Sequence, residues 1–326
     1  MKILVVKLSS LGDLFHALPA VHNIKVQTGA QIDWATHAPY ADLAGCFDDV
    51  DRVIAVPRHQ TLAQARAWLP ALRSERYDLV LDMQGLLKSA LVARLARRAR
   101  VLGPSFHREG SRLFYHAVAG PRDRSRHAVN ENLDFVAKLN LGKIEPVFPV
   151  TFPERPAQGD RPRIALLPAS RWPTKTWPPG HFAETARRLL PLRPTFFLMG
   201  GADSVAACTR IEADLEGRAI NLAGKTDLIE TGSVLQHMDL LIANDSGPVH
   251  MAAALGIPAL TIFGATDPAR TGPYGKKHQV VRAALDCPPC HSRSCRRHDR
   301  ACLQELAPET VAQTAARMLD ANRQSA

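Results

Sequence analysis

The sequence predicts an α/β protein with two halves of similar size, each a parallel sheet with helices on both faces. Short runs of valine, isoleucine and leucine alternate with segments of helical periodicity, first over residues 3–81 and again over residues 164–263. This alternation is typical of parallel sheets covered by helices. A proline-rich stretch at 146–156 separates the two series. The length of 326 residues also favours two domains of ordinary size.

The apolar pattern of each segment gives the elements that we expect. Strands in the first half are expected at 3–6, 32–35, 53–56 and 79–81, with a helix over 14–26. Strands in the second half are expected at 164–167, 196–199, 220–222, 240–243, 259–263 and 279–281, with helices over 178–190, 204–215, 227–238 and 248–255. After Pro308, apolar residues have the spacing of an amphipathic helix that packs back on the protein. We therefore expect domains at 1–155 and 156–307, followed by a C-terminal helix at 308–326.

Composition excludes several classes of protein. Apolar residues make up 46% of the chain and charged residues 22%, which excludes intrinsic disorder and collagen. No stretch reaches the roughly 18 uninterrupted apolar residues that a membrane-spanning helix needs. The apolar run at 3–6 is shorter than the core of a signal peptide. We therefore expect the protein to stay in the cytosol.

The charge of the chain favours an anionic partner. Lysine and arginine number 41 against 31 acidic residues, a net charge of +10. The basic residues are concentrated in one stretch, which contains Arg94, Arg97, Arg98, Arg100, His107, Arg108, Arg112, Arg122, Arg124, Arg126 and His127. This stretch is either an ordinary solvated face or a surface for phosphorylated small molecules or lipid headgroups. Few aromatic residues accompany it, so nucleic acid is not expected.

The loop after the first strand, KLSSLGD at 7–13, is polar and leads into a helix. In open parallel sheets, ligands bind at the carboxyl ends of the strands. Gly12 would let the backbone approach a ligand closely, and Asp13 falls in the first turn of the helix. The serines and Asp13 either cap this helix or supply a general base for a hydroxyl nucleophile.

Three loops in the second half follow strands in the same way. The segment NDSGPVH at 244–250 builds a helix start whose free N–H groups and positive dipole end suit an anion, with His250 one turn inside. It could also act only as a cap. The loop 168–178 holds Lys175, a point charge for a phosphate oxygen, and Trp172 and Trp177, which we expect to be structural. The loop 200–204 supplies two glycines and polar caps.

Two common phosphate-binding motifs are absent. The segment GKT at 224–226 resembles the end of a P-loop, but Ala219 stands where that motif requires glycine. No G-x-G-x-x-G pattern follows the first strand. A P-loop kinase and a nicotinamide or flavin enzyme are therefore not expected.

Four cysteines near the C-terminus have the spacing C-x2-C-x4-C-x6-C. They are Cys287, Cys290, Cys295 and Cys302. In a cytosolic protein they either hold a structural Zn or Fe ion or remain free thiols. Because the segment follows the strand at 279–281 and lies outside the loops described above, we expect it to be structural and dispensable for chemistry.

These motifs together resemble the lipopolysaccharide heptosyltransferases, glycosyltransferase family 9, and heptosyltransferase I in particular. VKLSSLGDLFHALPA at 6–20 is similar to the family's opening motif, and DMQGLLKSA at 82–90 to its second N-terminal motif. The segments NDSGPVH at 244–250 and FGATDP at 263–268 are similar to its sugar-nucleotide half. The cysteine segment is similar to one found in many members.

The resemblance implies a GT-B fold, with two Rossmann-like domains facing each other across a cleft. The first domain would bind the acceptor and the second ADP-heptose. The implied reaction is an inverting transfer of L-glycero-D-manno-heptose to 3-deoxy-manno-octulosonic acid (Kdo) of the lipopolysaccharide inner core, with no cofactor required. The acceptor would be Kdo-lipid A at the cytoplasmic face of the inner membrane, where the enzyme would lie at the periphery.

The resemblance also assigns roles to residues. Asp13 would be the base that deprotonates the acceptor hydroxyl. The donor would be bound by Ser170, Arg171, Lys175, Ser204, Thr226, Asp245, Ser246, Gly247 and His250. The acceptor would be bound by Lys7, Ser10, Gly12, Gln84 and Lys88. Ser204 and Thr226 depart from the family, which can carry an acid and a methionine there, and Ala169–Ser170 replaces a frequent Thr-Thr pair.

Two alternatives remain at this point. One is heptosyltransferase II or another family member with a different acceptor. The other, from a different class, is a non-catalytic, metal-containing nucleic-acid binder built on the basic stretch and the cysteines.

Overall fold

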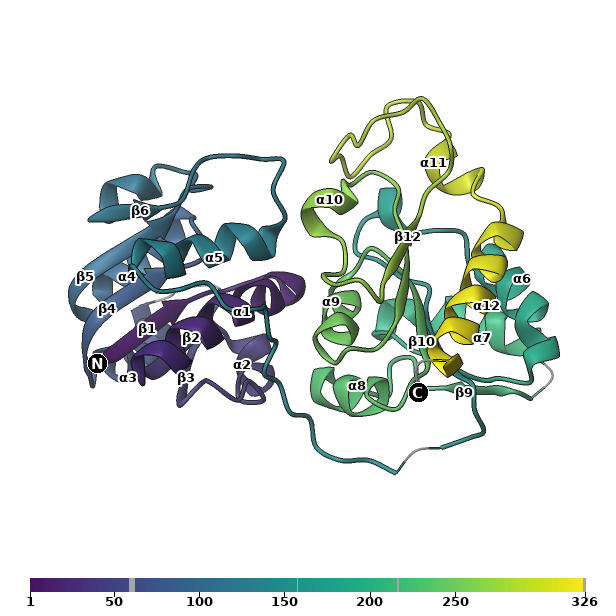
Figure 1. Cartoon of the computed structure of the whole chain (residues 1–326), viewed down its shortest axis with the longest axis horizontal. Helices are drawn as coiled ribbons and strands as arrows, with labels where there is room; N and C mark the ends of the chain where they lie inside the picture. Colours follow the sequence, from purple (N-terminus) through teal and green to yellow (C-terminus); the bar gives the residue numbers. More distant parts are fainter. Residues whose placement is uncertain (59–61, 157, 216, 325–326) are drawn as a thin grey trace. The chain divides into compact units, whose positions relative to one another are not determined.

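The computed structural model describes residues 1–58, 62–156, 158–215 and 217–324 and divides into two compact units, Met1–Thr151 and Phe152–Ala326. Each unit holds a six-stranded sheet in which every neighbouring pair of strands is parallel (Figure 1). The predicted α/β class with two parallel sheets is confirmed.

The first unit has the strand order β3-β2-β1-β4-β5-β6. Its strands are β1 (Lys2–Val6), β2 (Gln31–His37), β3 (Arg52–Val56), β4 (Arg76–Asp82), β5 (Arg97–Pro104) and β6 (Ala117–Ala119). Its helices are α1 (Leu11–Thr28), η1 (Ala38–Tyr40), α2 (Ala41–Ala44), α3 (Leu62–Arg73), α4 (Leu87–Leu95), η2 (Ser111–Phe114) and α5 (Ala128–Lys138). The central strand β1 is fully buried from Ile3 to Val6, as its unbroken apolar run predicts. The chain leaves β1 directly into α1, which places the loop 7–10 at the carboxyl edge of the sheet.

The second unit has the strand order β12-β11-β10-β7-β8-β9. Its strands are β7 (Arg163–Leu167), β8 (Thr195–Leu198), β9 (Ala219–Asn221), β10 (Leu240–Asn244), β11 (Ala259–Ile262) and β12 (Gln279–Val281). Its helices are η3 (Pro173–Lys175), α6 (Pro179–Leu189), η4 (Leu190–Leu192), η5 (Ala202–Ser204), α7 (Val205–Ala213), α8 (Leu228–Leu235), α9 (Gly247–Ala254), α10 (Pro268–Thr271), α11 (Ala301–Gln304) and α12 (Pro308–Gln324). The loops that follow β7, β8, β9 and β10 therefore share one edge of this sheet.

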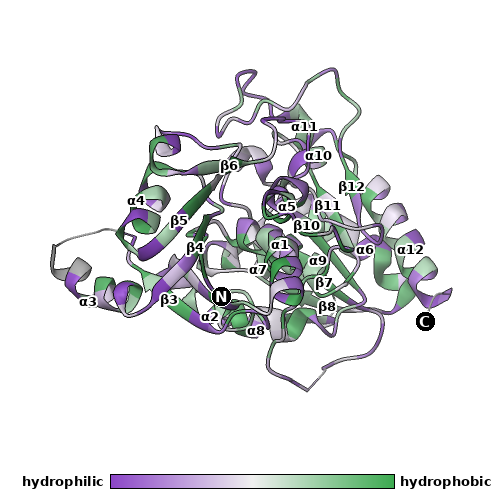
Figure 2. Ribbon diagram, turned by 60° about the vertical axis from the view of Figure 1, so that its left-hand side comes forward, coloured by the Kyte–Doolittle hydropathy of each residue, from purple (hydrophilic) through white to green (hydrophobic). Residues whose placement is uncertain are grey.

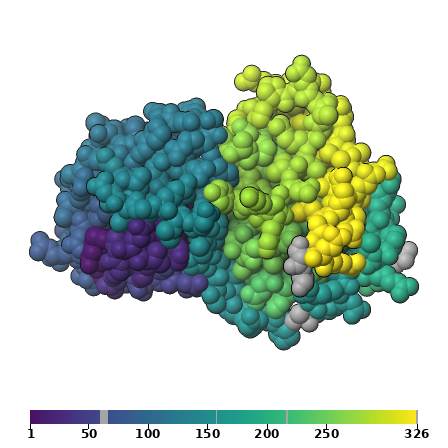
Figure 3. All heavy atoms as spheres, viewed as in Figure 1, coloured from purple at the N-terminus to yellow at the C-terminus, as the bar shows by residue number. Residues whose placement is uncertain are grey.

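The C-terminal helix α12 packs on the second unit. Val311, Ala315, Met318 and Leu319 are buried in the same hydrophobic cluster as Phe182 of α6. Figure 1 and the space-filling view of Figure 3 show α12 in yellow beside the teal helix α6. The expected amphipathic helix thus covers one face of the second sheet.

Candidate active site

In the first unit, the strand order reverses between β1 and β4, which are neighbours in the sheet. Their register places Val6 beside Asp82, so the loops 7–10 and 83–86 begin side by side. The Ser9 N–H donates to Gln84 Oε1 at 3.0 Å, and Lys7 Nζ donates to the Met83 carbonyl at 2.6 Å. Such a reversal of strand order is where open α/β sheets bind ligands.

Asp82 organises the loop that carries Gln84. Its carboxylate is fully buried and accepts hydrogen bonds from the N–H groups of Gln84 and Gly85 and from the hydroxyls of Ser89 and Tyr115. Burial raises the pKa of Asp82, and the four hydrogen bonds act in the opposite direction because they favour the carboxylate. Asp82 therefore fixes the loop that meets Ser9 and is not itself available to a ligand.

Asp13 lies in the first turn of α1. Its side chain caps the helix and is also exposed to solvent. Its Oδ2 accepts from the Ser10 N–H and from the Ser10 hydroxyl, each at 2.8 Å. Its Oδ1 lies 3.9 Å from His16 Nδ1, and the side chain is 40% exposed. Asp13 can therefore cap the helix and also act as a base, because only Oδ2 takes part in the capping contacts with Ser10 and Oδ1 does not.

The predicted acceptor residues have different environments. Lys7 is buried, and burial lowers its pKa while the charges of nearby acids oppose the shift. Gly12 is buried in α1, whereas Ser10 and Gln84 are partly exposed. Lys88 is exposed, and its Nζ lies 3.2 Å from Nε2 of His37.

His37 is a neutral imidazole in this arrangement. An ammonium can only donate, so Nε2 accepts from Lys88 and the proton is assigned to Nδ1, 3.1 Å from the Val56 carbonyl. Burial lowers the pKa of His37, in agreement with a neutral ring. Lys88 is therefore held at the carboxyl edge of the sheet.

In the second unit, the strand order reverses between β10 and β7, and Asn244 joins the loops there. Its Oδ1 accepts from the Trp177 N–H at 3.0 Å, and its Nδ2 donates to the Pro168 carbonyl at 2.7 Å. Because Asn244 is fully buried, these bonds hold both ends of the loop 168–178 against the end of β10. Trp177 is also fully buried, as expected for a structural tryptophan.

Lys175 and Asp245 form a largely buried ion pair at this point. Lys175 Nζ lies 2.6 Å from Asp245 Oδ2, and the two side chains are 19% and 6% exposed. The hydroxyl of Thr266 donates to the same carboxylate oxygen at 2.5 Å. Thr266 thus orients Asp245, a role that the sequence did not reveal.

The start of α9 adds backbone donors beside this pair. Ser246 is the N-cap residue, Gly247 is the first helical residue and His250 is buried one turn inside. The Ser170 hydroxyl donates to the Asp245 carbonyl at 3.1 Å, while Arg171 is exposed. A helix N-terminus next to a lysine is a site for an anion.

Ser204 and Thr226 lie on the two neighbouring loops of the same sheet edge. Ser204 is buried, with its hydroxyl 3.3 Å from Asp203 Oδ1, and the Thr226 hydroxyl lies 3.1 Å from that of Thr231. The Gly224 N–H donates to the Gly200 carbonyl at 2.8 Å, which joins the two loops. Both residues thus belong to the predicted sheet edge.

Comparison with known proteins decides the family. Residues 65–300 match the model of glycosyltransferase family 9 (heptosyltransferase). The chain belongs to glycosyltransferase family 9. Lipopolysaccharide heptosyltransferase 1 of Pseudomonas aeruginosa is 31% identical, over 96% of this chain and 96% of that protein. The protein of the same name from Escherichia coli K12 is 30% identical, over 87% and 94%.

A solved structure supports the fold of this family 9 glycosyltransferase. The E. coli heptosyltransferase WaaC with ADP matches with a TM-score of 0.82 at 27% identity, over 98% of this chain and 100% of that chain. The match spans both units and confirms the expected GT-B fold class.

The cysteine segment of this family 9 glycosyltransferase packs against the loops that carry Lys175 and Thr266. The sequence led us to expect this segment to lie apart from those loops. The Thr174 hydroxyl donates to the Ser292 carbonyl at 2.6 Å, and the His291 N–H donates to the Ala265 carbonyl at 2.8 Å. Between these loops, a Cβ on Gly264 would lie 2.7 Å from the Thr174 carbonyl, so only glycine fits. The contact between Thr174 and Ser292 joins residues 118 positions apart, and the sequence does not show it.

This placement brings a further cation to the site. The Arg293 guanidinium carbon lies 5.3 Å from the centre of the Trp172 ring, and Lys175 Nζ lies 4.9 Å from the same centre. The two positive groups are therefore at most about 10 Å apart. Arg293 is exposed and makes no ion pair within the part of the chain that the structure describes.

The four cysteines do not form a metal site as they are placed. Among the described residues, no three histidine, cysteine or acidic side chains are arranged to hold a metal ion, and no cysteine forms a disulfide. Burial raises the pKa of Cys302, and electrostatic interaction with the neighbouring Cys287, Cys295 and Cys290 raises it further. The arrangement thus fits neighbouring thiols and gives no support to a Zn or Fe ion.

Proposed function

We propose that this protein transfers L-glycero-D-manno-heptose from ADP-heptose to Kdo of the lipopolysaccharide inner core. The observation that carries the proposal is the ion pair of Lys175 and Asp245 at the start of α9. It lies in a chain that is about one-third identical to a lipopolysaccharide heptosyltransferase 1 over nearly its whole length. WaaC, with ADP and with ADP-2-deoxy-2-fluoro heptose, supports the choice of donor.

The donor residues suit the departure of a diphosphate. As the bond between heptose and ADP breaks, negative charge grows on the diphosphate oxygens. Lys175 and the free N–H groups of α9 would stabilise that charge, and His250, Ser246 and Gly247 would complete the contacts. Ser170 and Arg171 would border this site, and Ser204 and Thr226 would contact the nucleoside.

The acceptor residues suit the activation of a sugar hydroxyl. Asp13 would accept the proton of the acceptor hydroxyl through its carboxylate as the hydroxyl oxygen attacks the anomeric carbon. Ser10, Gly12, Gln84, Lys7 and Lys88 would position an acidic acceptor such as Kdo. One carboxylate is sufficient, because a diphosphate leaves without being protonated.

The proposed acceptor is Kdo-lipid A at the cytoplasmic face of the inner membrane, with the protein bound at the membrane periphery. Within the part of the chain that the structure describes, no helix is long and apolar enough to cross a bilayer.

A direct assay tests the function. The purified protein is incubated with ADP-heptose and either Kdo-lipid A or its mono-heptosylated product, and the products are identified by mass. We expect transfer to Kdo-lipid A. Transfer only to the mono-heptosylated lipid would identify heptosyltransferase II activity instead.

In a melting assay, ADP at about 100 times its Kd should stabilise the protein by about 2.7 kcal/mol, whereas oligonucleotides should not.

Arg293 gives a prediction within this function. Arg293→Gln should weaken ADP binding by about 3- to 10-fold, because a solvent-exposed guanidinium near the diphosphate contributes about 1 kcal/mol. Titration calorimetry with ADP measures the change, and raised salt should reduce it.

Arg296→Gln is the matched control, since it removes the same charge from the same exposed segment. Equal ADP affinities for the two variants and the wild type would show that the cysteine segment plays no part in donor binding, as the sequence alone led us to expect.

A further inference from the structure

The basic stretch of the first unit does not lie where an acceptor at Asp13 could use all of it. Arg97 and Arg98 begin β5, and in the register of the sheet they lie beside Arg76 and Tyr77 at the start of β4. Asp82 is the last residue of β4, so these arginines lie at the opposite edge of the sheet, roughly 20 Å from the site loops. They require a different explanation.

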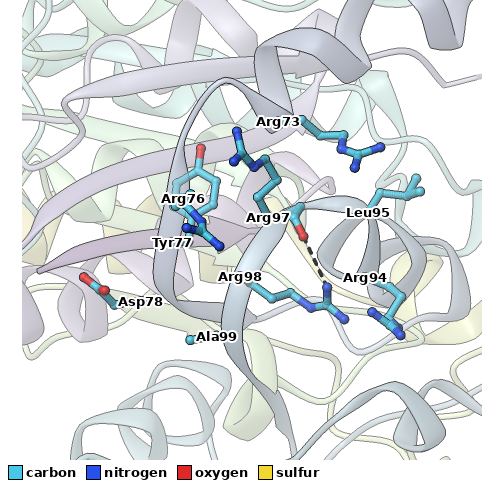
Figure 4. A pocket seen from close by; sticks show the side chains of 10 residues that line it. Arg73, Arg76, Tyr77, Asp78, Arg94, Leu95, Arg97, Arg98 and Ala99 are labelled. Atoms are coloured by element: carbon cyan, nitrogen blue, oxygen red, sulfur yellow. Dashed lines mark hydrogen bonds between the residues drawn. The ribbon is translucent and has the colours of Figure 1, made fainter.

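These arginines line one hollow, which we call the arginine pocket. It has a volume of about 710 Å³, and its charged lining residues are Arg73, Arg76, Asp78, Arg94, Arg97 and Arg98. Figure 4 shows that they come from the end of α3, the start of β4, the end of α4 and the start of β5. The pocket thus carries five positive charges against one negative charge.

The positive charge of the pocket is not balanced by the protein. None of the five arginines forms an ion pair with a described residue, and Asp78 accepts instead from the backbone N–H of Lys2 at 2.8 Å. Arg76 and Arg97 are direct cross-strand partners, an arrangement that repels. Burial and the nearby charge of Arg94 lower the pKa of Arg98. An anionic ligand would relieve this repulsion, and the planar guanidinium matches phosphate oxygens well.

An exposed apolar face runs from the active-site loop to the pocket. Leu87, Leu91 and Leu95 recur every four residues on α4, and their exposed fractions are 39%, 44% and 42%. Leu113 of the adjoining η2 is 88% exposed. We call these four residues the leucine face. Figure 2 shows α4 at the outer side of the first sheet, and Leu95 itself lines the arginine pocket.

We propose that the leucine face and the arginine pocket together form the surface by which this protein docks on an anionic phospholipid bilayer. Leucines beside arginines on one exposed surface match a bilayer whose apolar chains lie below anionic headgroups. Helix α4 starts directly after the loop 83–86 and ends at the pocket, so docking would place the membrane surface along the path to the site loops. The inference rests on the proposed function, because that function places the acceptor in a membrane.

Vesicle sedimentation tests the docking surface with the full chain. Vesicles of phosphatidylcholine with or without phosphatidylglycerol are mixed with the protein, and the bound fraction is measured. We expect binding to vesicles that contain phosphatidylglycerol, with an affinity that falls as salt is raised. Arg94→Glu/Arg98→Glu and Leu91→Ser/Leu95→Ser should each lower that affinity at least about tenfold.

The matched controls are Arg210→Glu, an exposed arginine on α7, and Val280→Ser, an exposed apolar residue on β12. Both should bind vesicles as the wild type does, and circular dichroism melts should show that every variant is folded. Unchanged vesicle binding by both double variants would overturn the proposal. Binding of inorganic pyrophosphate in the pocket without vesicle binding would also overturn it. A leucine face that serves only as a dimer interface would do the same, and would be seen as loss of a solution dimer in Leu91→Ser/Leu95→Ser.

A second readout separates this proposal from the proposed function. The four substituted residues lie outside the active site, so transfer to a Kdo acceptor without acyl chains should proceed at the wild-type rate in every variant. If the wild type transfers no heptose to either acceptor, the proposed function fails, while vesicle binding still reports on the docking surface.

Discussion

Asp13→Asn should lower the turnover number at least about 100-fold, the usual scale for the loss of a general base. An amide cannot accept the proton of the acceptor hydroxyl, although its oxygen can still accept the two hydrogen bonds that Ser10 donates. The variant should therefore melt near the wild-type temperature. Its affinity for ADP should be unchanged, because the proposed donor residues lie in the second unit. Initial rates at saturating substrates, with calorimetry for ADP, measure both effects.

Ser10→Ala is the matched control for Asp13. It removes the Ser10 hydroxyl from the carboxylate but leaves the backbone N–H bond in place. Loss of such a capping group costs about 1 kcal/mol of stability and should change turnover only a few fold. If a folded Asp13→Asn protein turned over as fast as the wild type, Asp13 would be a helix cap and the base would have to be sought elsewhere.

The fold could be predicted wherever burial dictates the residue types. Strands β1 and β7 are buried on both faces, and their unbroken apolar runs predict them within one residue. Strand β5 escaped prediction because it begins with Arg97, Arg98 and an exposed Arg100, which serve the pocket and the surface rather than the core. Its apolar part is too short to stand out.

The candidate site was predictable at the level of loops but not of partners. Chain order and strand polarity alone place Asp13, Lys175 and Asp245 at carboxyl edges. The pairing of Asp245 with Thr266, and of Trp172 with Arg293, joins residues 21 and 121 positions apart in the sequence. Only packing of the loops against one another brings such residues together, and a single sequence carries no trace of it.

Lys175→Met should weaken ADP binding by at least about 30-fold, and this loss should have two parts. The diphosphate loses a positively charged donor, and the largely buried Asp245 carboxylate is left without its partner at 2.6 Å. Breaking a buried hydrogen-bonded pair typically costs about 2 to 5 kcal/mol, and each 1.4 kcal/mol is tenfold in Kd. The unpaired carboxylate would also repel the incoming phosphates.

Adding Asp245→Asn to the Lys175→Met variant separates the loss of the positive charge from the effect of the unpaired Asp245 carboxylate. The double variant Lys175→Met/Asp245→Asn has no stranded charge, so it should bind ADP more tightly than Lys175→Met and still more weakly than the wild type. Thr266→Val is a milder control, since it removes the 2.5 Å hydrogen bond to Asp245 and leaves the ion pair intact. Wild-type affinity in the double variant would mean that Lys175 serves only as the counter-ion of Asp245, whereas wild-type affinity in Lys175→Met would place the diphosphate elsewhere on the second unit.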